Sequence, residues 1–474
     1  MKCAIVKPIQ LGGKAVYPLV DGGKGIGFTD GVSAGLWAKM GGIGTFSAAA
    51  ANYYDQQGKV VLYSFKSHIR AQRHEELIAQ EIKGAIAQVE KAYEMAEGNG
   101  LINLNILWEM GGTQRILEGV LEKSAHLLNA VTAGAGIPYE LGAIAAKYNI
   151  GFIPIVSSQR VTKILWMRAF KDYAKHLQAV VYEDPWKAGG HNGLSNQEDP
   201  LVPQSPKPRV KAIREFLNSV GLEHVPIIMA GNVWHLNEWR DFIDDPDMQP
   251  IAFQFGTRTL VTQENPSQHS MKMKYLSAGD EQQTVHLHAF SPTGLHSSAL
   301  ENTFLRKLID RSNRQVEYKR EKDEQFCCEF KLGARGRSIF VKINERDNVQ
   351  TWIDQGFTAG LPTPDGTMVF CVEEEARQIL EDQKACKGCL KGCKFSGWYE
   401  VDVNNHSTGI TPDPRSFCIF NTLYAASHED NADNNLLFAG QTVNRFSSDI
   451  FYKRDGAYYI PTIKELFERI LTGY

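Results

Sequence analysis

The stretch Ala179-Val180-Val181-Tyr182-Glu183-Asp184-Pro185-Trp186-Lys187-Ala188-Gly189-Gly190-His191-Asn192-Gly193 joins an apolar run to a glycine-rich loop. The apolar, β-branched part is typical of a buried strand, and the loop begins where that strand ends. Gly189 and Gly190 let the backbone pass close to a ligand, and His191 presents an imidazole at the same point. The stretch therefore indicates a site loop at a strand end. A glycine turn with an incidental surface histidine is the alternative interpretation.

Similar apolar runs alternate with helical patterns from the N-terminus to about residue 275. Eight strand and helix units of this kind predict a (β/α)8 TIM barrel, an α/β fold whose active site lies at the carboxyl ends of the strands. A doubly wound sheet is the competing fold. The expected strands are Val16–Val20, Gly42–Ser47, Ile102–Leu107, Leu127–Ala133, Phe152–Ser157, Ala179–Glu183, Val225–Ala230 and Ile251–Phe255, and the expected helices are Gly31–Lys39, His68–Glu97, Thr113–Lys123, Glu140–Lys147, Arg160–His176, Lys207–Val220 and Leu236–Ile243.

Small and polar residues gather where the expected strands end. In many barrels the loops after the seventh and eighth strands bind a phosphate through exposed backbone N–H groups. The joint placement of these residues favours a phosphate-bearing cofactor, although glycine is also common in short strand-to-helix loops. The residues are Gly22, Gly23 and Lys24 after the first strand, Asn105 in the third, and Ala230, Gly231, Asn232, Gly256 and Thr257 after the seventh and eighth.

The regular alternation of strand and helix patterns ends after the expected barrel. We divide the chain into the barrel (residues 1–275), the start of a small substrate or lid domain (276–310), a charged insertion of unknown role (311–384) and a C-terminal part with a cysteine cluster (385–474). A strand is expected from His286 to Thr293 and a helix from Ser298 to Ile309. In the insertion and beyond we expect a hairpin of Gln325–Leu332 with Arg337–Ile343, then helices over Glu373–Gln383 and Ile460–Leu471.

Composition places the chain among ordinary globular proteins. The net charge of -3 gives no electrostatic reason to expect nucleic acid as a partner. The N-terminal residues lack the apolar core of a secretory signal, and no run approaches the roughly 18 apolar residues of a membrane span. We therefore expect a cytoplasmic protein with no membrane partner, and the sequence is compatible with a homo-oligomer.

The cysteines divide into a cluster and three others. In a reducing compartment clustered cysteines are first interpreted as metal ligands, because thiolates repel one another unless a metal compensates them. Cys386, Cys389 and Cys393 follow the pattern C-x2-C-x3-C, with Cys418 as the best fourth ligand and Cys371 as the fallback. This spacing favours a [4Fe-4S] cluster over a single zinc, which remains the alternative. Cys3, Cys327 and Cys328 are expected to be packing residues.

The sequence resembles the nitronate monooxygenase family, formerly the 2-nitropropane dioxygenases, which also contains flavin-dependent enoyl-acyl-carrier-protein reductases. Within it the closest resemblance is to the iron–sulfur flavoproteins that dehydrogenate or isomerise acyl thioesters in unsaturated fatty acid synthesis. Asn232 stands where the family's phosphate loop has a second glycine, and residues from about 311 to 384 are extra. The matching residues are Gly22–Gly25, Asn105, Thr132–Pro138, Ile153–Ser158, Ala188–Gly193, Ala230, Gly231, Gly256–Arg258, Ser291–Gly294 and Ala439–Gln441.

The resemblance implies an FMN cofactor and a role for each matching position. His191 would be the base that removes a proton from an activated carbon, while the flavin accepts a hydride from its neighbour. Cys386, Cys389, Cys393 and Cys418 would hold a [4Fe-4S] cluster. The FMN phosphate would lie near Ala230, Gly231, Asn232, Gly256 and Thr257, and its ring over Gly22, Gly23 and Lys24, with Asn105 in contact and Gly189 and Gly190 beside it.

Three functions follow from these observations. The first is an FMN and [4Fe-4S] oxidoreductase that dehydrogenates or isomerises an acyl thioester, free or on an acyl-carrier protein, with enoyl-thioester reduction as a variant. The second is oxidation of alkyl nitronates with O2, which gives the iron–sulfur cluster no obvious task. The third is a non-catalytic module in which a zinc-stapled insertion binds a partner protein. A basic docking surface for an acidic carrier protein is expected among Arg306, Lys307, Arg311, Arg314, Lys319, Arg320 and Lys322.

Overall fold

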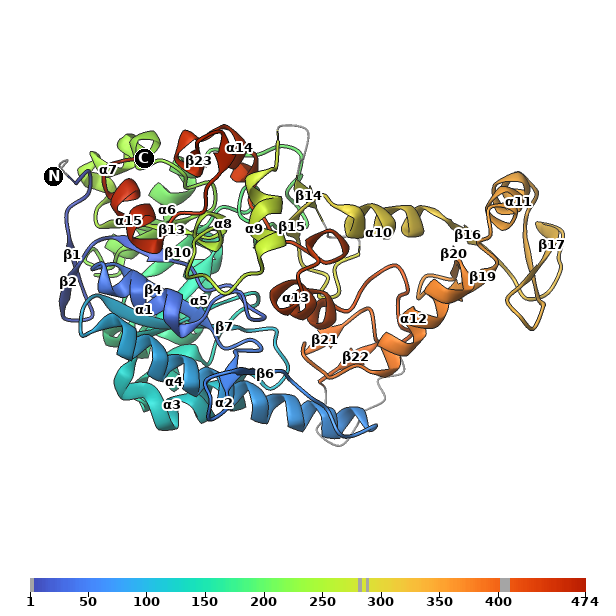
Figure 1. The fold of residues 1–474 in the computed structure, drawn as a ribbon, viewed down its shortest axis with the longest axis horizontal. Helices are drawn as coiled ribbons and strands as arrows, with labels where there is room; N and C mark the ends of the chain where they lie inside the picture. Colours follow the sequence, from blue (N-terminus) through green and yellow to red (C-terminus); the bar gives the residue numbers. More distant parts are fainter. Residues whose placement is uncertain (1–3, 280–283, 287–289, 401–409) are drawn as a thin grey trace.

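The computed structural model describes residues 4–279, 284–286, 290–400 and 410–474. Eight parallel strands close into a barrel in the order β10-β12-β13-β3-β4-β7-β8-β9, surrounded by helices (Figure 1). The predicted (β/α)8 barrel is therefore confirmed, and the doubly wound alternative is wrong because the sheet is closed. The barrel strands are β3 (Leu19–Asp21), β4 (Ile43–Ser47), β7 (Leu101–Leu107), β8 (Ala130–Gly134), β9 (Gly151–Val156), β10 (Val180–Glu183), β12 (Ile227–Ala230) and β13 (Ile251–Phe255).

All eight expected strands are present, but the first begins later than predicted. Val16 belongs to a separate antiparallel hairpin of β1 (Ile9–Leu11) and β2 (Lys14–Val16). Leu11 and Val16 of this hairpin pack against the side chains inside the barrel, among them Val20 and Ile43. A continuous apolar run in the sequence thus covers two elements, of which only the second enters the barrel.

The helices around the barrel mostly match the predicted ranges. The exceptions are the expected helix Arg160–His176, which divides into α5, a π-helical turn (Trp166–Phe170) and a 3-10 helix (Lys171–His176), and the expected Leu236–Ile243, which is a 3-10 turn followed by α7. Asp30 caps α1, because its side chain accepts a hydrogen bond from Ser33 N. The helices are α1 (Gly31–Lys39), α2 (Arg70–Ala96), α3 (Thr113–Ser124), α4 (Leu141–Lys147), α5 (Gln159–Leu165), α6 (Pro206–Ser219), α7 (Arg240–Ile243), α8 (Thr257–Leu260) and α9 (His269–Leu276).

A small sheet connects the loop after β10 to the segment that follows the barrel. The short strand β11 (Gly190–His191) pairs with β15 (Ser297–Leu300), which pairs in turn with β14 (Thr284–His286). The helix expected from Ser298 is wrong over its first residues, because α10 (Thr303–Asn313) begins after Asn302, whose side chain accepts from Leu305 N. Residues 287–289 of the strand expected at His286–Thr293, and Cys3, lie outside the described residues.

The segment predicted as an insertion forms an arm that projects from the barrel (Figure 1). The expected hairpin is confirmed as β17 with β18, and the expected helix as α12. Eight buried residues, including Val316, Phe330, Val341 and Phe370, form a core of their own in this arm. Its elements are β16 (Gln315–Glu317), β17 (Phe326–Leu332), β18 (Arg337–Lys342), α11 (Arg346–Asp354), β19 (Ala359–Pro362), β20 (Thr367–Cys371) and α12 (Glu373–Lys384).

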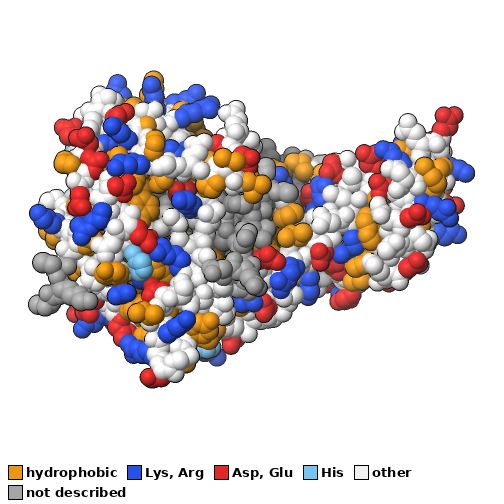
Figure 2. Space-filling view, turned by 90° about the horizontal axis from the view of Figure 1, so that it is seen from above, with side chains coloured by type: hydrophobic (Ala, Val, Ile, Leu, Met, Phe, Trp, Pro, Cys, Tyr) orange, Lys and Arg blue, Asp and Glu red, His pale blue; other side chains and the backbone are white. Residues whose placement is uncertain are grey.

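The C-terminal part returns from the arm to the barrel. The closing helix α15 packs on α1, where the Trp37 and Phe467 ring centroids lie 5.0 Å apart. No helix in the described part of the chain is both long and apolar enough to cross a membrane. Acidic and basic side chains are interspersed over the face drawn in Figure 2. The elements are β21 (Gly392–Cys393), β22 (Trp398–Tyr399), α13 (Ile419–His428), α14 (Arg445–Ser448), β23 (Lys453–Arg454), β24 (Ala457–Tyr458) and α15 (Ile463–Leu471).

Candidate active site

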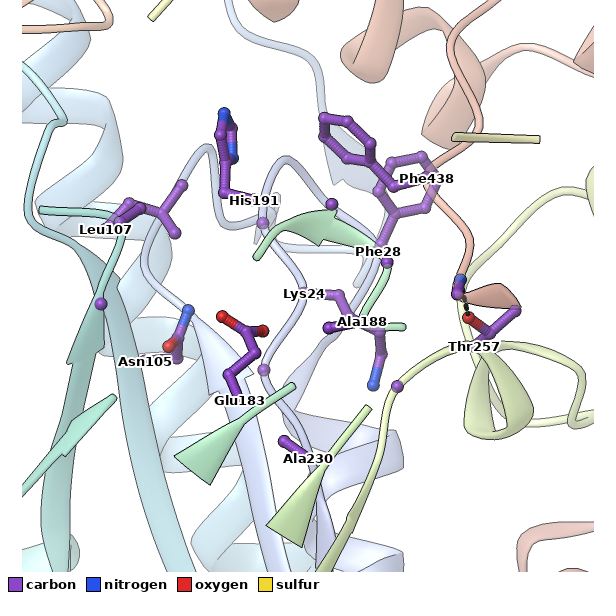
Figure 3. Close-up of a pocket in the computed structure, with 18 of the residues that line it drawn as sticks. Lys24, Phe28, Asn105, Leu107, Glu183, Ala188, His191, Ala230, Thr257 and Phe438 are labelled. Carbon is purple, nitrogen blue, oxygen red and sulfur yellow. Dashed lines mark hydrogen bonds between the residues drawn. The ribbon is translucent and has the colours of Figure 1, made fainter. Parts of the chain in front are cut away.

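A cavity of about 240 Å³ lies at the carboxyl ends of the barrel strands (Figure 3). Its walls come from the strand-end loops and from the C-terminal part, including Ile419, Phe420 and Phe438. Gly22 does not line it, because the side chain of Gln254 occupies the space beside that glycine. The other predicted cofactor and base residues all line it: Gly23, Lys24, Asn105, Gly189, Gly190, His191, Ala230, Gly231, Asn232, Gly256 and Thr257.

His191 lies at the rim of this cavity, above the strand ends and between Leu107 and Phe438 (Figure 3). The loop that carries His191 packs closely against the C-terminal part, because a side chain on Gly189 would lie 2.5 Å from Ala439 C and Gly440 N. This packing fixes the position of His191. The Nε2 atom of His191 lies 3.3 Å from Thr293 Oγ1, which lies 2.9 Å from Ser291 Oγ. Burial lowers the pKa of His191 to about 4, so the imidazole is neutral at pH 7. It is therefore held as a proton acceptor.

Two carboxyl groups in the cavity wall were not predicted as site residues. Glu183 ends β10 and points into the cavity between Asn105 and Ala188 (Figure 3). Burial, and then the charge of Asp184, raise the pKa of Glu183 to about 8. The sequence carried a signal for this residue, because an acidic side chain at the carboxyl end of a barrel strand faces the active-site mouth.

Glu81 reaches the cavity from α2, which lies outside the barrel. Its Oε1 atom accepts a hydrogen bond from Ala50 N at 3.0 Å, while Oε2 has no partner among the described residues. Burial raises the pKa of Glu81 to about 8, so this carboxyl is protonated at neutral pH. Glu81 falls on the buried face of its helix with Leu77 and Ile78, and helical spacing alone could have found it.

One end of the cavity suits an anion. Gly231 and Asn232 follow β12 with φ of +89° and +62°, so the asparagine adopts the left-handed conformation that glycine takes most readily. Open space surrounds the position that a side chain on Gly256 would occupy. Within the described residues, no protein acceptor is found for the backbone N–H groups of Asn232, Gly256 and Thr257. These donors fit a phosphate group.

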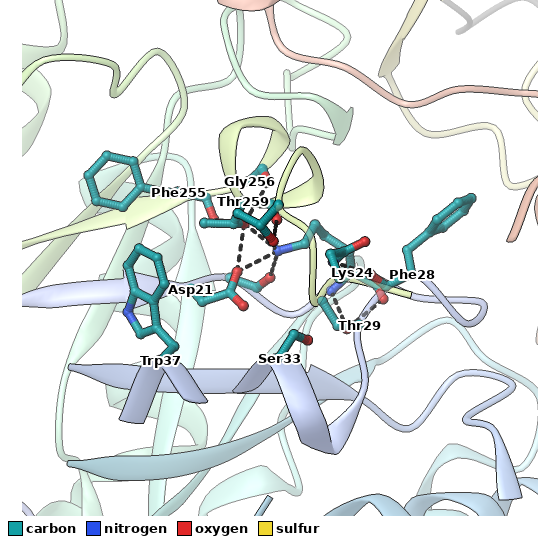
Figure 4. A network of polar contacts seen from close by, with 12 residues as sticks. Asp21, Lys24, Phe28, Thr29, Ser33, Trp37, Phe255, Gly256 and Thr259 are labelled. Carbon is teal, nitrogen blue, oxygen red and sulfur yellow. Dashed lines mark hydrogen bonds and ion pairs between the residues drawn. The ribbon is translucent and has the colours of Figure 1, made fainter. Parts of the chain in front are cut away.

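Lys24 lines the cavity, and its ammonium group is held by polar groups of the cavity wall (Figure 4). The Nζ atom lies 2.7 Å from Asp21 Oδ1 and 3.0 Å from Thr259 Oγ1, and it also donates to Gly22 O. Thr259 Oγ1 donates to the same carboxylate oxygen at 2.7 Å. This network ties the loop after β3 to the start of α8, so Lys24 fixes the shape of the cavity wall.

The four predicted cluster cysteines come into one neighbourhood beside the cavity. Burial raises the pKa of the Cys389 thiol well above its usual value, and the nearby thiols of Cys418, Cys393 and Cys386 raise it further. Cys389 also lines the cavity. Cys371, the fallback ligand, is buried in β20. Burial raises the pKa of its thiol, and Glu375, rather than a thiol of the cluster, raises it further. Across the described ranges, no three His, Cys, Asp or Glu side chains are arranged to hold a metal ion.

Comparison with known proteins finds similarity in solved structures. No protein-family model and no curated protein matches the chain. FabK from Thermotoga maritima has a TM-score of 0.52 at 15% identity, over 96% of this chain and 92% of that chain. The enoyl reductase domain of MlnA from the macrolactin biosynthesis cluster of Bacillus amyloliquefaciens has a TM-score of 0.49 at 11% identity, over 96% and 94%. Nitroalkane oxidase from Streptomyces ansochromogenes has a TM-score of 0.42 at 17% identity, over 61% and 78%.

These comparisons establish the fold. At 15% identity the likeness to FabK shows a shared barrel architecture over nearly the whole of both chains. The other two scores are too low to add to that statement. The chemistry of this chain therefore has to be argued from its own cavity.

Proposed function

We propose that this protein is an FMN-dependent oxidoreductase that acts on the α,β bond of an acyl thioester. The observation that carries the proposal is a neutral, half-buried imidazole, His191, at the rim of a glycine-lined cavity at the carboxyl mouth of a (β/α)8 barrel. A barrel mouth is where enzymes of this fold hold their ligands. The resemblance to nitronate monooxygenases points to the same cofactor and the same base.

The residues present fit FMN. The free N–H groups of Asn232, Gly256 and Thr257 would bind the phosphate. At the ring end, a side chain on Gly23 would lie 2.4 Å from Asn105 Cβ, so only glycine lets the loop after β3 approach Asn105 this closely. Asn105 would contact the ring. Bound in this position, FMN supplies a hydride acceptor or donor.

The protein's own groups would handle the proton. The carbon next to a thioester carbonyl is acidic, and the neutral His191 can accept its proton at physiological pH. The Thr293 hydroxyl contacts Nε2 of His191, and the Ser291 hydroxyl contacts that of Thr293, so these two hydroxyls fix the orientation of the imidazole ring. Glu183 is protonated at neutral pH and can donate a hydrogen bond into the cavity. In the reverse reaction, His191 would return the proton to the substrate carbon, and the same groups would support reduction of an enoyl thioester.

The cavity lining favours an acyl substrate. Apolar side chains, including Leu107, Met110, Ile419, Phe420 and Leu423, form much of the wall. Burial of an alkyl chain against them contributes about 0.8 kcal/mol per methylene. Nitronate oxidation needs the same base and flavin and is the second candidate, but short nitroalkanes would leave this apolar wall without a partner.

A carrier protein as the bearer of the acyl group remains part of the proposal. Several of the basic residues expected to dock it are engaged within the chain. Arg311 pairs with Glu375 at 3.2 Å, Lys319 pairs with Asp323 at 2.5 Å, and the Arg314 guanidinium lies 3.8 Å from the centroid of the Phe357 ring. Arg306 also pairs with Glu301, at 3.6 Å, so the freer candidates for a docking surface are Lys307, Arg320 and Lys322.

We further propose that Cys386, Cys389, Cys393 and Cys418 hold a [4Fe-4S] cluster. A single zinc needs all its sulfurs about 2.3 Å from one atom, whereas each cysteine of a cubane binds a different iron. Three close cysteines and a distant fourth that shares their neighbourhood suit the second arrangement better. Iron and sulfide analysis of anaerobically purified protein tests this proposal. Stoichiometric zinc without iron would support the non-catalytic module instead.

The experiment that tests the function is an anaerobic titration of the purified flavoprotein with acyl thioesters of increasing chain length. Bleaching of the flavin absorbance that depends on chain length is expected. Rapid turnover of propionate 3-nitronate with O2, and no bleaching with any thioester, would move the assignment to nitronate oxidation. A colourless protein that does not take up FMN would overturn both.

A further inference from the structure

Two adjacent cysteines, Cys327 and Cys328, lie on β17 at the outer end of the arm, far from the barrel (Figure 1). Side chains of neighbouring residues in a regular strand point to opposite faces. Here the pairing register shifts between Phe326, which faces Lys342, and Cys328, which faces Val341. Cys327 is the extra residue of this bulge, and a bulge re-aims a side chain. As a result the two Sγ atoms lie only 3.9 Å apart.

This separation matches a shared ion better than a disulfide bond. A zinc–sulfur bond of about 2.3 Å and a tetrahedral angle of about 109° separate two sulfurs on one ion by about 3.8 Å. A disulfide needs sulfurs about 2.05 Å apart and Cα atoms at least about 4.4 Å apart, whereas neighbouring Cα atoms are about 3.8 Å apart. Closing a bond between these thiols would distort the peptide that joins them.

Both thiols are partly accessible, and the packing role expected from the sequence is present for Cys328. Cys327 and Cys328 are each partly exposed, although Cys328 also contacts the arm core. Burial and the neighbouring Cys327 thiol raise the pKa of Cys328, while Arg346 and Asp347 of α11 act on it in opposite directions. In the described chain no third His, Cys, Asp or Glu completes a site.

We propose that Cys327 and Cys328 form a two-thiolate binding site for one thiophilic divalent cation such as Zn²⁺, with water completing its coordination. Binding releases the two thiol protons and forms two metal–sulfur bonds, with no change in oxidation state. The site is separate from the four-cysteine group beside the cavity, because it lies on a different element at the other end of the arm.

Equilibrium dialysis of the full-length protein against Cd²⁺ tests the site. The four-cysteine group also offers thiols, so the informative quantity is the difference between variants. Cys327→Ser and Cys328→Ser are each expected to bind one equivalent of Cd²⁺ less than the wild type. Cys371→Ala, which removes a buried thiol of the same arm, is expected to match the wild type. Equal stoichiometry in all four proteins would overturn the proposal.

Alkylation of the unaltered protein gives a second measurement that does not depend on a variant. Cd²⁺ is expected to protect Cys327 and Cys328 together from iodoacetamide, as read by mass spectrometry of the peptide that contains both. Full labelling of either thiol at saturating Cd²⁺ would overturn the proposal. So would a disulfide between the two cysteines in the protein as purified.

Discussion

Replacing Glu81 with glutamine is expected to change how the stability of the protein depends on pH. The Glu81 pKa is about 8 in the folded state, and its usual value is 4.5. Between these values the unfolded chain releases a proton that the folded protein keeps, so the free energy of unfolding falls as pH rises. The slope for one such group is about 1.4 kcal/mol per pH unit. Glutamine has nearly the same shape, retains an acceptor for Ala50 N, and does not titrate.

The wild type should therefore lose roughly 2.5 kcal/mol more than Glu81→Gln between about pH 5 and pH 7. Urea unfolding followed by tryptophan fluorescence measures this difference. Glu183 contributes a similar slope to both proteins and cancels in the comparison. Glu90→Gln, an exposed position on the same helix, is the matched control and should follow the wild type. Parallel pH profiles for wild type and Glu81→Gln would refute a buried, protonated Glu81.

Three further predictions concern the cavity. Gly23→Ala should weaken FMN binding at least about tenfold, because its new methyl group would lie 2.4 Å from Asn105 Cβ. Titration followed by flavin fluorescence measures the affinity, and an unchanged affinity would place the flavin ring elsewhere. The pKa of His191 is about 4, and only the neutral imidazole accepts a proton, so the rate of anaerobic flavin reduction should stay constant from pH 7 to 5 and fall only near pH 4. A fall centred near pH 6.5 would contradict this prediction. Thr293→Val should slow flavin reduction about tenfold in stopped-flow without loss of bound flavin, because the hydroxyl orients His191; an unchanged rate would remove that role.

The barrel could be predicted because its strands are buried on both faces. Such strands form continuous apolar runs, and runs such as Ile251–Phe255 match the observed strands. The boundaries failed where one run served two elements, as at Val16, or where a capping residue was overlooked, as at Asn302 before α10. The order of the strands in a barrel also determines which loops meet at its mouth. The sequence could therefore predict that His191 and the glycines after β12 and β13 line one cavity.

The remaining features depend on contacts between distant parts of the chain. Nothing near Lys24 in the sequence indicates that its ammonium is held by Thr259, which follows the neighbouring barrel strand β13 but lies 235 residues later in the chain. The pairing of Cys327 with Cys328 arises from a register shift that only the partner strand β18 reveals. Glu183 is different, because its place at the end of a predicted strand could have identified it as a site residue, although it was not predicted as one.

The central claim is that His191 takes the substrate proton beside a flavin bound at the barrel mouth. Single-turnover reduction of the flavin by an acyl thioester, compared anaerobically in wild type and His191→Gln, tests it most directly. The variant should retain its flavin but react roughly 10² to 10⁴ times more slowly. Reduction at the wild-type rate in His191→Gln would contradict the claim.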